Sequence, residues 1–565
     1  MIGRVLITLL VVVVALISYP GALLVSLATR LTPAPNAPAG REGALPWLHV
    51  AHPADGRPYI ADDQGRIVML HGAIPAGLID FWTGPDQSQP NVPPLYPIDP
   101  TEYDGGQCPA NSSLSRYPPF CRADVEAMAT LGFNSIRLPI SWSLLEPARG
   151  HFSQTYIARV AQVIEWAKSA QMYVIIDMHQ NGYSRYVGPG DDVNLSYLSG
   201  APRWATITDG FPSRVFLGQR ELNPAVFEAA SNFWYDRAGI QDEYIAAVAL
   251  IAQRFKDESV VAGYSIFNEP WPGWNLPPGF EDLLLFPFYR RVIDAITGVR
   301  DGTPCWSGFF MPAPCGYRDL GVRDQRHLIF LDTGLLREVT DFPTHLGLPV
   351  SSYPNLVLAL HTYTHEYTFD KLVGQTPDQA TYPWGGYDQS YVFADREARA
   401  MDAALFVAEV GAPPQWDYLM TANQLTEQDR QRIGFAFWTW KENGGKDSWG
   451  IFNPPGSPPE SSGCLRAARE RLLARVFPKA SGDRNLRYSY DPGTGGFALA
   501  ATGQRGAPAT MVYIPPEVRG EVSTGGGVHG SIATNTDGSR VVTALPTGGP
   551  FRVSVAPQSL ALTGC

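Results

Sequence analysis

Two glutamates in this sequence end apolar, β-prone segments and could work together as a proton donor and a nucleophile. Glu269 closes the segment "YSIFNEP", where it follows Asn268, and Glu409 lies in "VAEVG". Charged side chains are rarely buried without partners, so carboxylates at the ends of apolar strands need a chemical reason. A facing pair of carboxyl groups suits cleavage of a glycosidic bond, where one protonates the leaving oxygen and the other acts as nucleophile or base.

Six further polar or aromatic side chains lie within or at the ends of similar segments. They are Arg137, His179, Asn268, His361, Tyr363 and Trp438. Arg137 and Tyr363 could keep Glu409 ionised, and Asn268 could hydrogen-bond a sugar 2-hydroxyl. The two histidines suit holding hydroxyls and orienting carboxylates, and the tryptophan offers a flat face beneath a sugar ring. Any one of them could be a satisfied core group, but so many together predict a site.

The segments that carry these residues alternate with amphipathic helical patterns. They read apolar throughout, which is typical of strands buried on both faces of a parallel sheet. Eight such segments predict an α/β fold, a (β/α)8 barrel with long insertions. They span residues 67–73, 134–140, 172–179, 262–269, 327–332, 356–363, 404–411 and 434–440. Because the carboxyl ends of barrel strands converge on one face, we expect the candidate residues to meet there.

The pattern changes after about residue 475. Apolar and polar residues then alternate between Gly, Asn and Asp turns, which predicts a C-terminal antiparallel β-sandwich. We therefore expect a catalytic barrel over residues 46–475 and a sandwich over residues 476–565. The sandwich reads as a packing partner for the barrel, with a glycan- or lipid-facing module as the alternative.

The first 45 residues form a unit of their own. A charge-free run from Val5 to Thr29 is long enough to span a bilayer. It also fits a signal peptide with "SLA" as the cleavage site, and a buried soluble helix is the third interpretation. A Pro- and Ala-rich linker follows. We expect secretion or membrane anchoring, with the catalytic part outside the cytoplasm.

Six cysteines agree with export, because disulfides persist in oxidising compartments. The nearest pairs in sequence predict three bridges, with free buried thiols as the alternative. The predicted pairs are Cys108 with Cys121, Cys305 with Cys315, and Cys464 with Cys565. Since neither a Cys-x-x-Cys motif nor a His-rich cluster occurs, a structural zinc site is not expected.

Charge and composition limit the partners. The net charge is −11, so no excess of basic residues exists to neutralise phosphates, and nucleic acid is not an expected partner. The 565 residues are too many for one compact core, and an aromatic content of 12% suits a site that stacks sugar rings. We expect a monomer.

The order of the motifs adds a resemblance to a known family. "NSIRLPISW", "IIDMHQ", "IFNEP", "LHTY", "VAEVG" and "FAFWTWKE" resemble the successive motifs of retaining β-glycosidases of glycoside hydrolase family 5. Within that family, "FWYDRAGIQDEYIAAV", "FWTWKEN" and "YSYDPGTGGF" are most similar to the endoglycoceramidases, over residues 55–560.

The resemblance implies roles for the candidate residues. Glu269 matches the acid/base and Glu409 the nucleophile, and the six further side chains match the subsite for the sugar at the bond being cleaved. It implies hydrolysis of the β-linkage between a glycan and ceramide with retention, without a metal or other cofactor. The substrate would be a glycolipid, and membrane contact would come through that lipid or the N-terminal segment.

Some positions depart from the family pattern. Asn181 stands where the family usually has Asp, and "IFLDTG" lacks the usual Glu-Pro. Another amphiphilic glycoside, such as a steryl glycoside, therefore stays open as the substrate. A β-glucan or a free oligosaccharide also stays open as the substrate. A third alternative is a glycan-binding protein that has lost its catalytic activity.

An apolar leaving group would need an apolar groove. Trp271, Trp274, Phe280 and residues 283–288 follow Glu269 and could line it. Alternatively, that run is a helix packed on the barrel.

Overall fold

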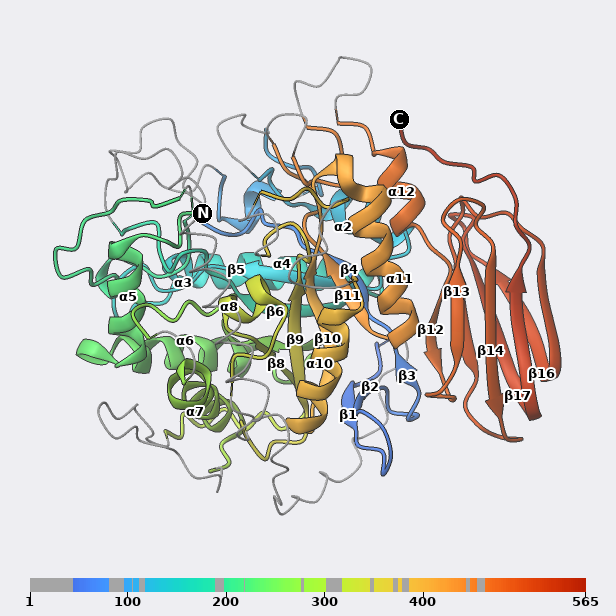
Figure 1. The fold of residues 1–565 in the computed structure, drawn as a ribbon, viewed down its shortest axis with the longest axis horizontal. Helices are drawn as coiled ribbons and strands as arrows, with labels where there is room; N and C mark the ends of the chain where they lie inside the picture. The colour runs from blue at the N-terminus through green and yellow to red at the C-terminus, as the bar shows by residue number, and fades with distance from the viewer. Residues whose placement is uncertain are drawn as a thin grey trace.

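The computed structural model of this chain shows a helix-wrapped barrel packed beside an antiparallel sheet (Figure 1). It describes residues 44–565 except 81–95, 104, 111–116, 188–197, 218, 276–278, 301–317, 346–349, 369–373, 379–385, 444–447 and 455–462. Residues 1–43 of the predicted N-terminal segment thus lie outside the described part. Among the helices that are described, none is both long and apolar enough to cross a bilayer.

Eight parallel strands close into a barrel, which confirms the predicted fold class. The strands follow one another around it in sequence order, and the last pairs with the first. They are β4 (His71–Ala73), β5 (Ser135–Ile140), β6 (Tyr173–Met178), β7 (Val261–Ser265), β8 (Leu328–Asp332), β9 (Leu356–Thr362), β10 (Ala404–Val410) and β11 (Gly434–Phe437). Each falls within, or within one residue of, a predicted segment.

Helices lie around the barrel between its strands (Figure 1). They are α2 (Arg122–Thr130), α3 (Trp142–Leu145), α4 (Gln154–Ser169), α5 (Pro224–Trp234), α6 (Ile240–Phe255), α7 (Phe286–Thr297), α8 (Leu335–Thr340), α10 (Gln389–Ala400), α11 (Ala422–Gln431) and α12 (Ala467–Leu473). Local sequence sets their ends. Ser153 caps α4 by accepting a hydrogen bond from the Tyr156 amide, and Gly298 ends α7 with a left-handed φ of 68°.

Alternation along each barrel strand sorts side chains between two cores. In β6, Val174 and Ile176 pack outward with the helices, whereas Tyr173 and Ile175 belong to a second core shared by the barrel strands. This is the period of two that a strand imposes on its side chains. A polar residue at an inward position near the end of a strand therefore points into the mouth of the barrel.

The second sheet has nine antiparallel strands, and its inner face holds a separate apolar core. The strands are β1 (His49–Ala51), β2 (Tyr59–Ala61), β3 (Ile67–Val68), β12 (Phe477–Ser481), β13 (Arg487–Tyr490), β14 (Phe497–Gly503), β15 (Thr510–Ile514), β16 (Val522–Thr534) and β17 (Arg540–Val555). In β13 and β14 buried and exposed residues alternate, as predicted for a sheet with one face in water.

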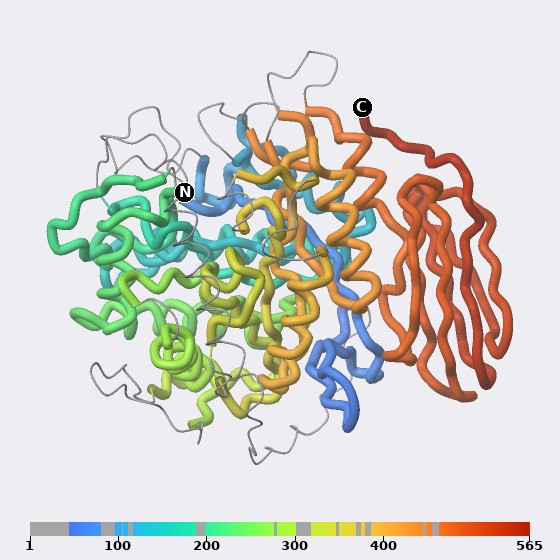
Figure 2. The backbone as a smooth tube through the Cα atoms, in the orientation of Figure 1, coloured from blue at the N-terminus to red at the C-terminus, as the bar shows by residue number. Residues whose placement is uncertain are grey.

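The predicted first barrel segment, 67–73, is not one strand. Ile67 and Val68 form β3, which pairs with β12 of the antiparallel sheet, and the barrel strand starts only at His71. Figure 2 shows this early part of the chain beside the C-terminal strands. The antiparallel sheet therefore takes three strands from residues 49–68, which corrects the predicted barrel range of 46–475 at its start. The chain passes directly from the antiparallel sheet to the barrel within one continuous apolar run, so the sequence pattern does not reveal where one strand ends and the next begins. The 475/476 boundary stays a prediction.

Two of the three predicted disulfides are present, Cys108–Cys121 and Cys464–Cys565. The second joins residues 101 positions apart and fixes the C-terminal end of the chain near α12. The predicted bridge between Cys305 and Cys315 lies outside the described residues.

Candidate active site

Glu409 reaches the barrel mouth because β10 is irregular. Ala408 belongs to the inner core, so strict alternation would turn Glu409 outward. The register of β10 with β9 shifts between Val407 and Glu409, and its register with β11 shifts between Val407 and Val410. Such an irregularity re-aims the side chain that follows it. The Glu409 carboxylate then faces its neighbours across the barrel.

Two donors hold that carboxylate. The Arg137 Nη1 group donates to Glu409 Oε1 at 2.5 Å, and the Tyr363 hydroxyl donates to Oε2 at 2.6 Å. Burial and the nearby Glu409 charge raise the pKa of Tyr363 well above its ordinary value, so the hydroxyl keeps its proton. Both oxygens of Glu409 are therefore fixed by short, charge-assisted hydrogen bonds.

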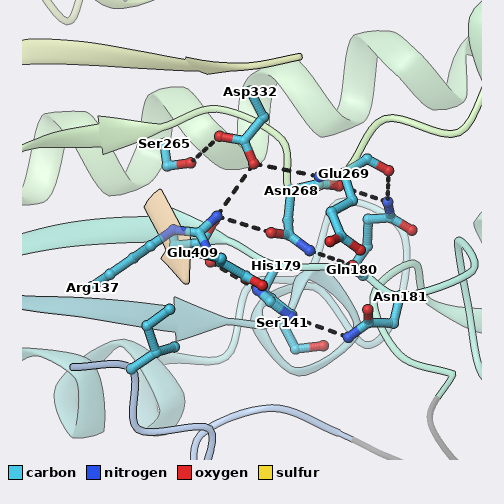
Figure 3. Close-up of polar contacts among 12 residues, drawn as sticks. Arg137, Ser141, His179, Gln180, Asn181, Ser265, Asn268, Glu269, Asp332 and Glu409 are labelled. Atoms are coloured by element: carbon cyan, nitrogen blue, oxygen red, sulfur yellow. Dashed lines mark hydrogen bonds and ion pairs between the residues drawn. The ribbon is translucent and has the colours of Figure 1, made fainter. Parts of the chain in front are cut away.

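Arg137 is fully buried and connects four strands (Figure 3). Its Nη2 donates to Asn268 Oδ1 at 2.8 Å and lies 3.1 Å from Asp177 Oδ1 and 3.2 Å from Asp332 Oδ2. Burial would lower the pKa of Arg137, but the surrounding carboxylates raise it further than burial lowers it. The guanidinium therefore stays charged and acts as the fixed cation of the site.

Glu269 lies four residues beyond the end of β7, where its φ is +41°. Positive φ is uncommon for residues other than glycine. Gln180 Nε2 donates to the Glu269 carbonyl at 2.8 Å, and the Glu269 amide donates to Asp332 Oδ2 at 3.4 Å. The side chain is 15% exposed, against 5% for Glu409. Glu269 is thus the more open of the two carboxyl groups.

His361 lies between both glutamates. Its Nδ1 is 3.1 Å from Glu269 Oε1 and 3.7 Å from Glu409 Oε2, while its Nε2 is 3.2 Å from Asp332 Oδ2. Burial would lower the pKa of His361, but the carboxyl groups around it, Glu338 foremost, raise it well above its ordinary value. A protonated imidazole there bridges a carboxyl group beyond the end of β7 with those of Asp332 on β8 and Glu409 on β10.

His179 and Trp438 complete the site on another side. Their rings stack at 5.6 Å with an angle of 4° between planes, and His179 Nδ1 lies 2.8 Å from Asp177 Oδ2. Asn181 Nδ2 lies 3.1 Å from His179 Nε2, and Asn181 Oδ1 accepts from Arg220 at 3.1 Å. The amide that departs from the family pattern is therefore connected to the site.

All eight predicted side chains come together through these contacts. Asn268 differs in detail, because its oxygen accepts from Arg137 and its nitrogen donates to the Gln180 carbonyl at 2.8 Å. It is fully buried, and both ends of its amide already have partners. In this structure it orients Arg137, and its predicted contact with a sugar hydroxyl stays a prediction.

Sequence reasoning missed three buried acids of the site, Asp177, Asp332 and Glu338. Strand period gave a signal for two of them. Asp177 is two residues beyond the inward Ile175, and Asp332 is two beyond the inward Phe330. Glu338 lies on the short helix α8, so no strand pattern could have revealed it.

The predicted apolar groove after Glu269 is largely absent from the surface. Trp271 and Phe280 are buried in the main core, as are the described side chains of α7 that face the barrel. The packing interpretation is therefore confirmed for most of this run. Trp274 is the exception, being half exposed and in ring contact with Phe211 and Phe227.

A family model described as cellulase (glycosyl hydrolase family 5) matches residues 109–444, which include every candidate residue. The chain belongs to glycosyl hydrolase family 5. It is accordingly a glycoside hydrolase, and the arrangement of two glutamates at the carboxyl end of a parallel barrel fits that chemistry.

Relatives of this family 5 chain include endoglycoceramidase I of Rhodococcus hoagii, 22% identical over 89% of the chain and 87% of the relative. A solved structure of an endogalactoceramidase is 26% identical, with a TM-score of 0.67, and covers 91% of this chain and 100% of that one. Ergosteryl-β-glucosidase of Saccharomyces cerevisiae is 36% identical, but over only 30% of the chain and 20% of the relative.

Proposed function

We propose that this family 5 chain is a retaining β-glycosidase that cleaves the bond between the glycan and the ceramide of glycosphingolipids. Glu269 is the acid/base and Glu409 the nucleophile. The observation that carries the assignment is the pair of carboxyl groups within 3.1 and 3.7 Å of one nitrogen, His361 Nδ1. That closeness suits retaining enzymes, whose carboxyl groups lie about 5 Å apart, better than inverting ones, which need room for a water.

The environments of the two glutamates support this division of roles. Glu409 is deeper and held by Arg137 and Tyr363, which stabilise its anion and aim it, as a nucleophile requires. Glu269 is more exposed, and none of the contacts of Arg137 in the described part of the chain goes to its carboxylate. A proton donor must also reach the leaving group, which enters from the open side.

The reaction proceeds in two steps. Glu409 attacks the anomeric carbon while Glu269 gives its proton to the leaving oxygen, which departs as the ceramide hydroxyl. Glu269 then takes a proton from water, and the resulting hydroxide displaces Glu409 from the sugar. The Trp438 ring, stacked on His179, supplies a flat surface for the sugar during both steps.

The ceramide part of the proposal rests on two relatives that span most of the chain. These are endoglycoceramidase I and the solved endogalactoceramidase, which also matches the fold of both sheets. An export route fits the same reading, because the two described disulfides need an oxidising compartment. We propose that the catalytic part acts outside the cytoplasm as a monomer and meets its substrate at a membrane.

Substitution of each glutamate tests the assignment. We expect Glu409→Gln to abolish turnover of glucosylceramide and of an aryl β-glycoside, because no nucleophile is left. Glu269→Gln should slow glucosylceramide severely but an aryl glycoside with a good leaving group much less, because only the former needs a proton. Release of ceramide measures turnover of glucosylceramide, and release of phenolate measures turnover of the aryl glycoside. Near-normal activity of either variant on glucosylceramide would remove the assignment.

A second substrate class deserves testing because of the yeast relative. Ergosteryl-β-glucosidase is 36% identical to this chain over the matched 177 residues. A panel of glucosylceramide, lactosylceramide, steryl glucoside and cellooligosaccharides separates the three classes of substrate. Preferred hydrolysis of the cellooligosaccharides would point to a β-glucan enzyme instead.

A further inference from the structure

One buried carboxyl group of the site has no part in the reaction described so far. Glu338 on α8 is 2% exposed. Its Oε1 accepts from the Thr333 hydroxyl at 3.3 Å, whereas its Oε2 has no hydrogen-bond partner. That oxygen lies 3.6 Å from His361 Nδ1. Buried polar atoms are rarely left unpaired without a functional reason.

The neighbouring nitrogen is shared with the proton donor. His361 Nδ1 is also 3.1 Å from Glu269 Oε1. A ring nitrogen carries only one proton, so it can donate one strong hydrogen bond at a time. Glu269 and Glu338 therefore compete for the same donor.

The charges around Glu338 affect whether its carboxyl group carries a proton. Its charged neighbours are His361 of β9, Glu269, Asp332 and Glu409. The charge of Glu338 also helps to raise the pKa of Tyr289 on α7. The adjacent Arg337 instead pairs with Glu397 at 2.8 Å. Burial, with the three other acids, raises the pKa of Glu338 well above its ordinary value, so Glu338 competes as a neutral carboxylic acid that accepts through its unpaired oxygen.

We propose that Glu338 is a positioning residue for the acid/base: while Glu269 holds its proton, Glu338 takes the His361 Nδ1 hydrogen bond that this structure gives to Glu269, and so keeps the transferable proton on Glu269. The inference rests on the proposed function. When His361 donates to Glu269, it stabilises the anion and weakens the acid. When it donates to Glu338, Glu269 stays protonated until the leaving oxygen takes that proton. Glu269, now anionic, then accepts the Nδ1 hydrogen bond until water reprotonates it in the second step.

The test compares two leaving groups in a Glu338→Leu variant, which removes the acceptor. We expect a loss of about tenfold or more in kcat/KM for glucosylceramide, and less than about threefold for a 2,4-dinitrophenyl β-glycoside, whose departure needs no proton. The upper limb of the pH profile for glucosylceramide should move down by about one pH unit, because Glu269 alone now pairs with His361. Glu338→Gln, whose amide oxygen can accept, should restore most of the activity.

Glu281→Leu is the matched control. Glu281 is equally buried, and burial raises its pKa too, but its hydrogen bond goes to Thr344 rather than to His361. We expect it to leave the ratio between the two substrates and the pH limb as in the wild type.

Several results would overturn the proposal. An equal loss on both substrates with an unmoved pH limb in Glu338→Leu would show a merely structural role. If that variant does not fold, Glu338→Asp withdraws the carboxyl group by one methylene and should show the same selective loss. Glu269→Gln is run beside them. If it lacks the leaving-group effect, the proposed function fails. If it shows the effect and the Glu338 variants do not, only this inference fails.

Discussion

At the scale of single residues, the two glutamates of the site are held differently, in line with the roles proposed for them. Glu409 has a donor on each oxygen, from Arg137 and from Tyr363. Glu269 instead shares one histidine nitrogen with a second buried carboxyl group, that of Glu338. A group that must gain and lose a proton in each turnover cannot be held in one ionisation state, whereas a nucleophile can be.

Tyr363→Phe tests how Glu409, the proposed nucleophile, is held. A hydrogen bond to a charged group contributes about 1.5–3 kcal/mol, so its loss should lower kcat about tenfold to a hundredfold. Tyr391→Phe is the control, because Tyr391 is also buried and hydrogen-bonded, but to Gln424 and Gln428 rather than to a carboxylate. The test compares kcat of the two variants on an aryl β-glycoside under steady-state conditions. Equal rates would mean that the Tyr363 hydroxyl does not orient Glu409.

At the scale of elements, the barrel strands fit together with little free space. A Cβ at Gly263 of β7 would lie 2.0 Å from the Leu328 carbonyl oxygen of β8. Real atoms do not approach so closely, so any larger residue would push these neighbouring strands apart. Ser265 and Asp332, which hold the catalytic ends of the same two strands together, would move with them.

We expect Gly263→Ala to destabilise the protein by several kcal/mol and to lower activity through displacement of those strand ends. Gly525→Ala is the control, since Gly525 also lies in a strand, β16, but a Cβ there meets nothing within 4 Å. Thermal unfolding and kcat are measured for both. An unchanged Tm in Gly263→Ala would show that the barrel tolerates the wider spacing.

At the scale of the whole molecule, barrel and sheet are joined by buried contacts. His71 of β4 stacks on Phe477 of β12 at 3.8 Å. Asp429 of α11 accepts from Tyr488 of β13 at 3.0 Å and pairs with Arg475. Burial raises the pKa of Asp429 to about 6 despite these partners. The junction therefore contains an acid that folding makes easier to protonate.

This acid gives the junction a pH dependence. Because the folded pKa is above the unfolded one, the contribution to stability is fully present below about pH 4 and is lost as the pH rises through about 6, by about 3 kcal/mol. Asp429→Asn should remove this decline. Urea unfolding of both proteins from about pH 4 to 7 measures the difference. Parallel curves would show that Asp429 does not titrate in this window.

How much could be predicted from the sequence differs between strands and their connections. The eight apolar runs predicted the barrel because strands buried on both faces have a plain signature. Most of the predicted site residues lie near strand ends or just beyond them, where that signature stops, whereas Arg137 lies within β5. The prediction of one strand over residues 67–73 was wrong because two short strands of different sheets share one apolar stretch. The apolar residues after Glu269 could equally line a groove or pack a core, since composition does not distinguish the two.

The sequence by itself therefore determined the barrel and marked the two glutamates and their six companions as candidates, because local pattern encodes strand positions and strand ends converge. Only the tertiary structure decided which groups touch. The irregularity of β10 that turns Glu409 inward depends on pairing with its neighbours. Glu338 enters the site from a helix far from Glu269 in sequence. Such contacts join residues 23 to 92 positions apart, and they exist only when packing brings distant segments to one place.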